Sequence, residues 1–95
     1  MKMNIFAHYD KKLCIFGKPF FEVKTKEIVI EENVRVLKSG HCHLQPQMLD
    51  LDFYFLGVFD DKTCEFDLIQ KPEYLFSIAE NWIKPVEESE NVESA

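Results

Sequence analysis

The stretch LGVFDDKTCEFDLI, residues 56–69, constrains the fold more than any other part of this sequence. Two runs of alternating apolar and polar side chains flank the polar residues DDKT, which is the pattern of an antiparallel hairpin with a short turn. Cys64 follows the turn where a tight turn usually has glycine, the residue that adopts a left-handed backbone most easily. The stretch therefore predicts a hairpin of strands 51–59 and 64–70 with one unusual residue.

The first strand of this hairpin is apolar on both sides. Its two sets of side chains are Leu51, Phe53, Phe55 and Phe59 against Tyr54, Leu56 and Val58. Such a strand is typical of the centre of a sheet, covered on one face by helices and on the other by protein or a partner. In the second strand, Cys64, Phe66 and Leu68 are predicted to point inward and Glu65 and Asp67 outward. This alternation predicts an antiparallel partner with one solvated face.

The first third of the chain adds shorter strands at residues 3–9, 13–16 and 20–23. Residues 25–39 are ambiguous between helix and strand. Thr25 as N-cap and Gly40 after the last turn favour a helix, whereas five β-branched residues favour a strand. We favour the helix, because the charged residues of this segment share one side at helical spacing.

The last third of the chain predicts a second helix, at about residues 73–84. Pro72 suits the first turn of a helix, and apolar residues then recur at helical spacing up to Ile83, before Pro85. The sequence thus predicts a single α+β domain over residues 1–84, with a small antiparallel sheet. Residues 85–95 contain four Glu and no aromatic residue, and we expect them to form an acidic, disordered tail.

Charge and cysteine usage narrow the class of protein. The net charge is −6, but residues 1–40 carry eight basic and five acidic side chains, and residues 41–95 carry three basic and twelve acidic ones. The acidic balance repels nucleic acid overall, although the first half can still form a basic face. Three cysteines without a CxxC pair indicate free thiols in a reducing compartment. No run is long or apolar enough for a membrane span or a signal peptide.

Aromatic side chains interleaved with lysines suit single-stranded nucleic acid, because bases stack on rings and lysines contact phosphates. Phe20 and Phe21 are adjacent on an extended segment, so both cannot face the same core, and one of them is a candidate surface contact. Core packing or an interface with a partner protein would explain the rings equally well. The candidate residues are Tyr9, Lys11, Lys12, Phe16, Lys18, Phe20, Phe21 and Lys24, with Phe6 as a further ring.

The segment His41-Cys42-His43 is the one metal-like cluster in the sequence. A closed zinc site needs four ligands, and no second cluster supplies the others, so ordinary loop residues are the simpler interpretation. A cysteine with a nearby histidine can also act as a nucleophile, but no local signature supports such a pair here. We therefore expect no cofactor and no enzymatic activity.

Three motifs occur in an order that resembles a known family. They are Ile-Phe-Ala-His-Tyr-Asp-x-Lys at 5–12, Pro-Phe-Phe at 19–21 and Leu-Gly-Val-Phe-Asp-Asp-x-Thr at 56–63. The set is similar to the small nonstructural protein of gokushoviruses, which are single-stranded DNA bacteriophages of the microvirus group, over about residues 3–83. The chain departs from that family at Cys64, where relatives have glycine, and at Gln47, Met48 and Leu49, where they have His-Pro-Glu before Asp50.

The resemblance implies a nonstructural, non-enzymatic phage protein that acts in the host cell cytoplasm and is not expected in the mature virion. Its implied role is in viral single-stranded DNA synthesis or packaging, through binding of the DNA or of the replication complex. The alternative is a protein-interaction module that binds a host or phage protein, including an acidic inhibitor that mimics DNA. A homodimer is a further expectation, because a second copy can cover a strand that is apolar on both faces.

Overall fold

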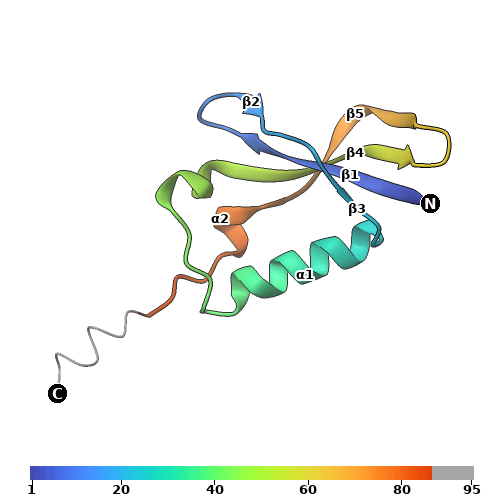
Figure 1. The fold of residues 1–95 in the computed structure, drawn as a ribbon. Helices are drawn as coiled ribbons and strands as arrows, with labels where there is room; N and C mark the ends of the chain where they lie inside the picture. The colour runs from blue at the N-terminus through green and yellow to red at the C-terminus, as the bar shows by residue number, and fades with distance from the viewer. Residues whose placement is uncertain (87–95) are drawn as a thin grey trace, which may run out of the picture.

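The computed structural model describes residues 1–86 as an α+β fold with the sheet in one layer and the helices in the other (Figure 1). In chain order the elements are β1 (Lys2–Asp10), β2 (Ile15–Phe16), β3 (Phe20–Glu22), α1 (Lys26–Lys38), the 3-10 helix η1 (Pro46–Asp50), β4 (Leu51–Asp60), β5 (Glu65–Ser77) and α2 (Ile78–Asn81). Residues 87–95, which make up most of the predicted acidic tail, lie outside the described residues. No helix within residues 1–86 is long and apolar enough to span a membrane.

The sheet is antiparallel throughout. β4 lies between β1 and β5, which confirms the prediction that this strand is central. On its other side, β1 pairs with β2 near its end and with β3 near its start. The segment 15–22 thus acts as one broken edge strand, and β5 forms the opposite edge.

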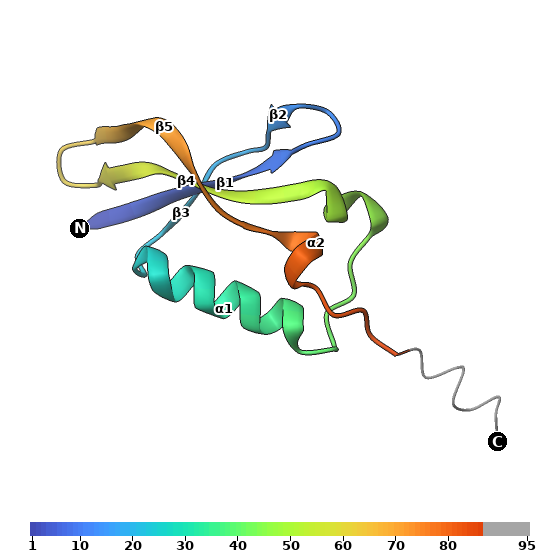
Figure 2. The same ribbon diagram turned by 180° about the vertical axis from the view of Figure 1, so that it is seen from behind.

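The core lies between the sheet and the two helices, which are on the same side of the sheet (Figure 2). Phe6 and Phe53 are almost completely buried, and their ring centroids are 5.3 Å apart. Val29 and Leu37 of α1 pack against them from the helix layer. Burial of this kind contributes about 1.5–3 kcal/mol per large side chain. It outweighs the few tenths that each β-branched residue costs a helix, so the helix prediction for residues 25–39 is confirmed.

The ends of α1 also agree with the sequence. The Thr25 hydroxyl accepts a hydrogen bond from the Ile28 amide at 3.3 Å, as an N-cap does. Gly40, two residues after the helix, has a left-handed φ of +80°. Glycine adopts this conformation without the steric penalty of a side chain.

The predicted second helix at 73–84 is mostly wrong. β5 continues to Ser77, and α2 spans only Ile78–Asn81. Residues 73–77 form a strand instead of a helix because β4 pairs with this segment and Phe76 stacks on Phe53, with ring centroids 4.9 Å apart. Pro72 does not interrupt the strand, because residues 69–72 form a bulge that faces a single residue of β4, where no amide is needed for the ladder.

Two hairpin turns of the sheet share an unusual feature. Cys14 and Cys64 both have left-handed backbones, with φ of 59° and 61°. Each donates its amide to the carbonyl of the aspartate that begins its turn, Asp10 or Asp60, at 2.7 and 2.8 Å. Cys64 therefore does occupy a position that favours glycine, at a cost of about 1–2 kcal/mol for a residue with a Cβ.

Replacing Cys64 with glycine is expected to raise the free energy of unfolding by about 1 kcal/mol, because glycine removes the Cβ strain but gains entropy in the unfolded chain. For a domain of this size the melting temperature should rise by about 4–8 °C in a circular dichroism melt. Cys64→Ala is the matched control, since it removes the thiol but keeps the Cβ, and it should show no such gain. Equal melting temperatures for wild type and Cys64→Gly would contradict this explanation.

Candidate nucleic-acid interface

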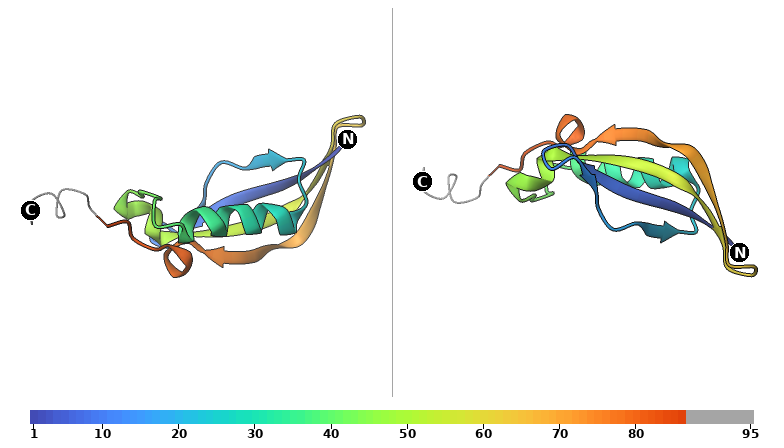
Figure 3. Two further views of the ribbon diagram at one scale, coloured as in Figure 1. Left: turned by 90° about the horizontal axis from the view of Figure 1, so that it is seen from below. Right: turned by 90° about the horizontal axis from the view of Figure 1, so that it is seen from above.

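The face of the sheet opposite α1, here called the helix-free face, is defined by the strand register. Phe6 and its partner Phe55 face the helix layer, so Ile5 and Ala7 on either side of Phe6 face away from it. Seen from above, the strands lie in front of α1, and no helix within residues 1–86 crosses this face (Figure 3, right). In β4, a bulge at Leu56 shifts the alternation, so Val58 lies on the helix side and Phe59 on the helix-free face. The two sets of side chains predicted for this strand are therefore wrong at these two residues.

Seven aromatic rings gather on the helix-free face in two clusters. The Tyr9 cluster consists of Tyr9, Phe16, Tyr54 and Tyr74, with neighbouring centroids 4.8–5.9 Å apart. The Phe21 cluster consists of Phe21, Phe59 and Phe66, with centroids 4.7–6.4 Å apart. Ile5 and Ala7, both buried, lie on β1 between the two clusters and form the floor.

Several of these rings are open to solvent. The exposed fraction is 42% for Phe16, 43% for Phe21, 49% for Tyr74 and 56% for Phe66. Leu68, the neighbour of Phe66 on this face, is 61% exposed. The alternation predicted for β5 is therefore correct, but none of the three residues expected to point into the core does so. Cys64 is exposed in the turn, and Phe66 and Leu68 are exposed on the strand. The helix layer covers one face of the sheet, and these two residues lie on the other.

Most carboxylates of the strands lie on the face of the sheet opposite the ring clusters. By register, those of Asp10, Glu22, Asp60, Glu65, Asp67 and Glu73 lie on the helix side. Among the described strand residues, Asp52 is the one acid on the helix-free face, and it is buried. Its Oδ1 has no hydrogen-bond partner within residues 1–86, but the Lys11 ammonium lies 3.3 Å away. Lys11 thus compensates this charge electrostatically rather than through a well-formed hydrogen bond.

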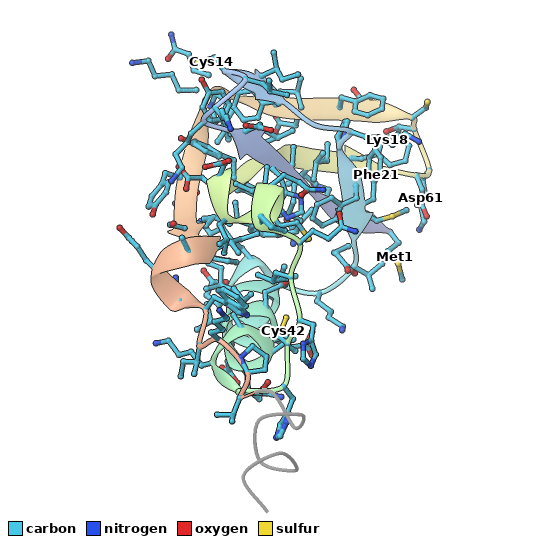
Figure 4. All side chains as sticks on the ribbon, turned by 90° about the vertical axis from the view of Figure 1, so that its left-hand side faces the viewer. Met1, Cys14, Lys18, Phe21, Cys42 and Asp61 are labelled. Carbon is cyan, nitrogen blue, oxygen red and sulfur yellow. The ribbon has the colours of Figure 1, made fainter. Side chains whose placement is uncertain are left out.

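The predicted lysines divide between the two sides of the sheet. Lys12 and Lys18 are exposed, and neither has a carboxylate partner within the described residues. In Figure 4, Lys18 and Phe21 both lie well away from Cys42. Lys24 instead pairs with Glu32 of α1 at 2.8 Å, which places its charge on the helix side.

The structure therefore brings most of the predicted residues together, but not all of them. Tyr9, Lys11, Phe16 and Phe21 lie on the helix-free face. Lys12 and Lys18 lie in the loops on either side of β2, and Lys12 lines a hollow with Asp10 and Asp50. Phe20 stacks on Phe6 at 5.8 Å and belongs to the core side, with Lys24. Adjacent Phe20 and Phe21 do face opposite sides, as the extended backbone requires.

Four rings of this face were not among the predicted site residues. They are Tyr54, Phe59, Phe66 and Tyr74, all on β4 or β5. The signal was present in β4, which is apolar on both sides, since one of those sides has to face away from the helix layer. What the sequence lacked was the register that joins β4 and β5 to the rings of β1.

The hydroxyl groups of Tyr9 and Tyr74 stay neutral at physiological pH. A side-chain hydrogen bond with Cys14 raises the pKa of Tyr9 above its ordinary value of 10.0. Burial, followed by the charges of Glu80 and Asp52, raises the pKa of Tyr74. Tyr9 and Tyr74 therefore add no negative charge that would repel a phosphate backbone.

The metal-like segment His41-Cys42-His43 does not form a metal site in the structure. Cys42 packs against the core, and its carbonyl accepts a hydrogen bond from the Trp82 indole at 2.7 Å, whereas His41 and His43 are exposed. Within residues 1–86 no three metal-ligating side chains come together. In the same part of the chain, no hydrogen bond joins a cysteine thiol to a histidine.

A concave region lies on the helix side of the sheet, between the sheet, α1 and the loop before η1. It is a cavity of about 420 Å³ with a mainly apolar lining that includes Leu44, Met48 and Phe76. His8 also lines it, and its ring lies between those of Phe20 and Phe53 at 5.7 and 5.2 Å. Burial lowers the pKa of His8 from its ordinary value of 6.5, because the charged imidazolium is poorly solvated there.

This depressed pKa predicts a loss of stability in mild acid. Above pH 6.5 the imidazole is neutral in both states, but below it the unfolded chain binds a proton that folded His8 resists. The urea midpoint should therefore fall between about pH 7 and pH 5, and His8→Gln should reduce that slope. A slope that is unchanged in His8→Gln would assign it to other groups.

Comparison with known proteins gives the family. The family model of the phage ORF5 protein matches residues 3–81, which include both α-helices and all of the sheet except Lys2. A search of curated proteins and a search of solved structures found no match. Because the match covers most of the chain, this is a phage protein that belongs to the phage ORF5 protein family.

Proposed function

We propose that this phage protein is a nonstructural accessory protein that binds viral single-stranded DNA on its helix-free face, during DNA synthesis or packaging. One observation carries the proposal. Two clusters of partly exposed rings lie on a face from which the strand carboxylates are absent, except for Asp52 beside Lys11. The gokushovirus resemblance of the sequence motifs supports the same role.

The physical basis is stacking assisted by phosphate contacts. A base stacked on an aromatic ring contributes about 1–3 kcal/mol, and the contribution depends little on base identity. Along β1, Tyr9 and Ile5 are four residues apart, so the two clusters are separated by about 13 Å. A strand of several nucleotides can reach both clusters, with its phosphates near Lys12 and Lys18. Duplex DNA cannot do so, because its bases are paired and stacked inside the helix.

The positions of the acidic side chains explain how a protein with a net charge of −6 could bind single-stranded DNA. The acidic side chains of the sheet are on the helix side, where Glu73 pairs with Lys26 at 2.9 Å. A strand bound to the opposite face is separated from them by the sheet. The excess of acid weakens binding over longer distances, and salt screens that contribution.

The lysines give the test of this proposal. In fluorescence anisotropy, wild type is expected to bind labelled oligothymidine more tightly than the duplex form, with an affinity that falls as salt rises. Each phosphate contact contributes roughly −0.7 to the slope of log K against log salt. Lys12→Gln with Lys18→Gln should therefore make the slope about 1.4 less negative.

The matched control for this test is Lys38→Gln, which removes one positive charge from the last turn of α1, on the other side of the sheet. It should leave the salt slope unchanged. If Lys38→Gln changes the slope as much as substitution of Lys12 does, the phosphates do not lie on the helix-free face.

A partner protein on the same face is the second candidate function. The exposed Leu68 and Phe66 favour it, because apolar strand surface is typical of protein interfaces. The partner would be a component of the replication complex or another host or phage protein, and a DNA-mimic inhibitor is one form of this role. Pull-down from infected-cell lysate treated with DNase separates the two functions, since only a protein contact survives.

The proposal also includes the setting in which the protein acts. It places the protein in the host cell cytoplasm and outside the mature virion, and it requires neither a catalytic step nor a cofactor.

A further inference from the structure

The edge strand β5 has a free side. It ends the strand order of the sheet, and within residues 1–86 it pairs with β4 alone. Residues 65–74 are all exposed, and residues 69–72 face a single β4 residue in the bulge. An exposed edge with apolar side chains is a template for another strand, unless the protein protects it.

The sequence of this edge, EFDLIQK at 65–71, is complementary to itself. If two copies pair antiparallel about Leu68, Glu65 of each copy lies opposite Lys71 of the other. Within the described residues, neither Glu65 nor Lys71 has an ion-pair partner inside its own chain. The register with β4 places Glu65 on the helix side, and Lys71 lies in the bulge, from which its long side chain would reach Glu65 of the other copy.

Charge also selects this register over its neighbours. A shift of the partner by two residues in one direction sets Asp67 opposite Asp67. A shift in the other direction sets Glu65 opposite Glu73, which offsets the attraction of Asp67 opposite Lys71. Like charges directly opposite one another destabilise an antiparallel pair. The register centred on Leu68 has two opposite-charge pairs and no like-charge pair, with apolar Leu68 against Leu68 on the two-fold axis.

We propose that two copies of this chain form a dimer by antiparallel pairing of β5 in the register centred on Leu68. The two-fold axis is perpendicular to the sheet, so the helices of both copies lie on one side and the two helix-free faces form one continuous surface. Closed two-fold dimers are the commonest assembly of identical chains. This inference does not depend on DNA binding, although a dimer would lengthen the surface that the strand contacts.

Sedimentation velocity over a wide concentration range tests the dimer with charge reversals. Wild type should associate reversibly. Glu65→Lys and Lys71→Glu should each weaken association by roughly tenfold or more, because every substitution changes two symmetric pairs from attractive to repulsive. The double variant Glu65→Lys with Lys71→Glu should restore association, since both pairs are then attractive again.

Two further measurements complete the test. All three variants should melt within a few degrees of wild type, because these side chains are exposed and unpaired in the monomer. Leu68→Lys should abolish association by placing two ammonium groups on the axis. A wild type that stays monomeric at every concentration would overturn the proposal. So would a dimer that the single reversals leave intact, or one that the double reversal does not restore.

Discussion

Replacing Gly57 with alanine is expected to lower the free energy of unfolding by about 3–5 kcal/mol. Gly57 has a φ of +151°, a conformation that residues with side chains rarely adopt. A Cβ there would lie 2.7 Å from the Leu68 Cα and closer still to the Asp67 carbonyl oxygen. Both are backbone atoms of β5 and cannot rotate away, so the ladder between β4 and β5 would have to open.

The loss is large in relation to the whole domain. A chain of this size has a total stability of about 5–14 kcal/mol, so Gly57→Ala should leave a marginal fold. Urea denaturation measures the change, and the melting temperature should fall by at least about 12 °C. The same variant should reduce any β5-mediated dimer, because it disturbs the strand on which the interface is built.

Gly17 provides the matched control for this substitution. A Cβ at Gly17 would lie 3.7 Å from the His8 carbonyl oxygen, an ordinary contact, and its φ is not positive. Gly17→Ala should therefore change stability by less than about 1 kcal/mol in either direction. Similar losses at both glycines would contradict the close approach of β4 and β5.

The second large effect is expected in DNA affinity. Phe16 and Phe21 represent the two ring clusters, and both are partly exposed. Replacing both with leucine keeps apolar bulk but removes the aromatic faces, so two stacked bases lose about 1–3 kcal/mol each. The dissociation constant for oligothymidine should rise by at least about 30-fold at constant salt, as measured by fluorescence anisotropy.

Tyrosine at the same two positions separates stacking from packing. Phe16→Tyr with Phe21→Tyr keeps the rings, and its affinity should stay within a few-fold of wild type. Both variants should melt close to wild type, since the two side chains are not part of the buried core. If the leucine and tyrosine variants bind alike, the rings do not stack on bases.

Local patterns predicted much of the sheet and its first helix. The pattern of residues 3–9 predicted β1, which spans Lys2–Asp10. The turn chemistry identified the hairpin of β4 and β5, and Thr25 marked the start of α1. These features depend on contacts between residues close together in the sequence, and local sequence patterns predict such contacts.

The errors arise where distant segments decide the outcome. Helical spacing after Pro72 predicted a long helix, but pairing with β4 and stacking of Phe76 on Phe53 extend β5 instead. Phe66 was assigned to the core because alternation shows which residues share a face and not which face is covered. The same limitation hid Tyr54, whose neighbours in the ring cluster include Tyr9 of β1 and Phe16 of β2. It also hid Tyr74, which joins the cluster through Tyr54.

A titration of isotope-labelled protein with oligothymidine, followed by NMR at low salt, tests the helix-free face most directly. Phosphate contacts are strongest at low salt, so binding has the best chance to be seen there. The expected result is shifts of ring and amide signals at Tyr9, Phe16 and Phe21, with the outer face of α1 unaffected. Shifts confined to α1, or no shifts at the lowest salt, would contradict single-strand binding by this face.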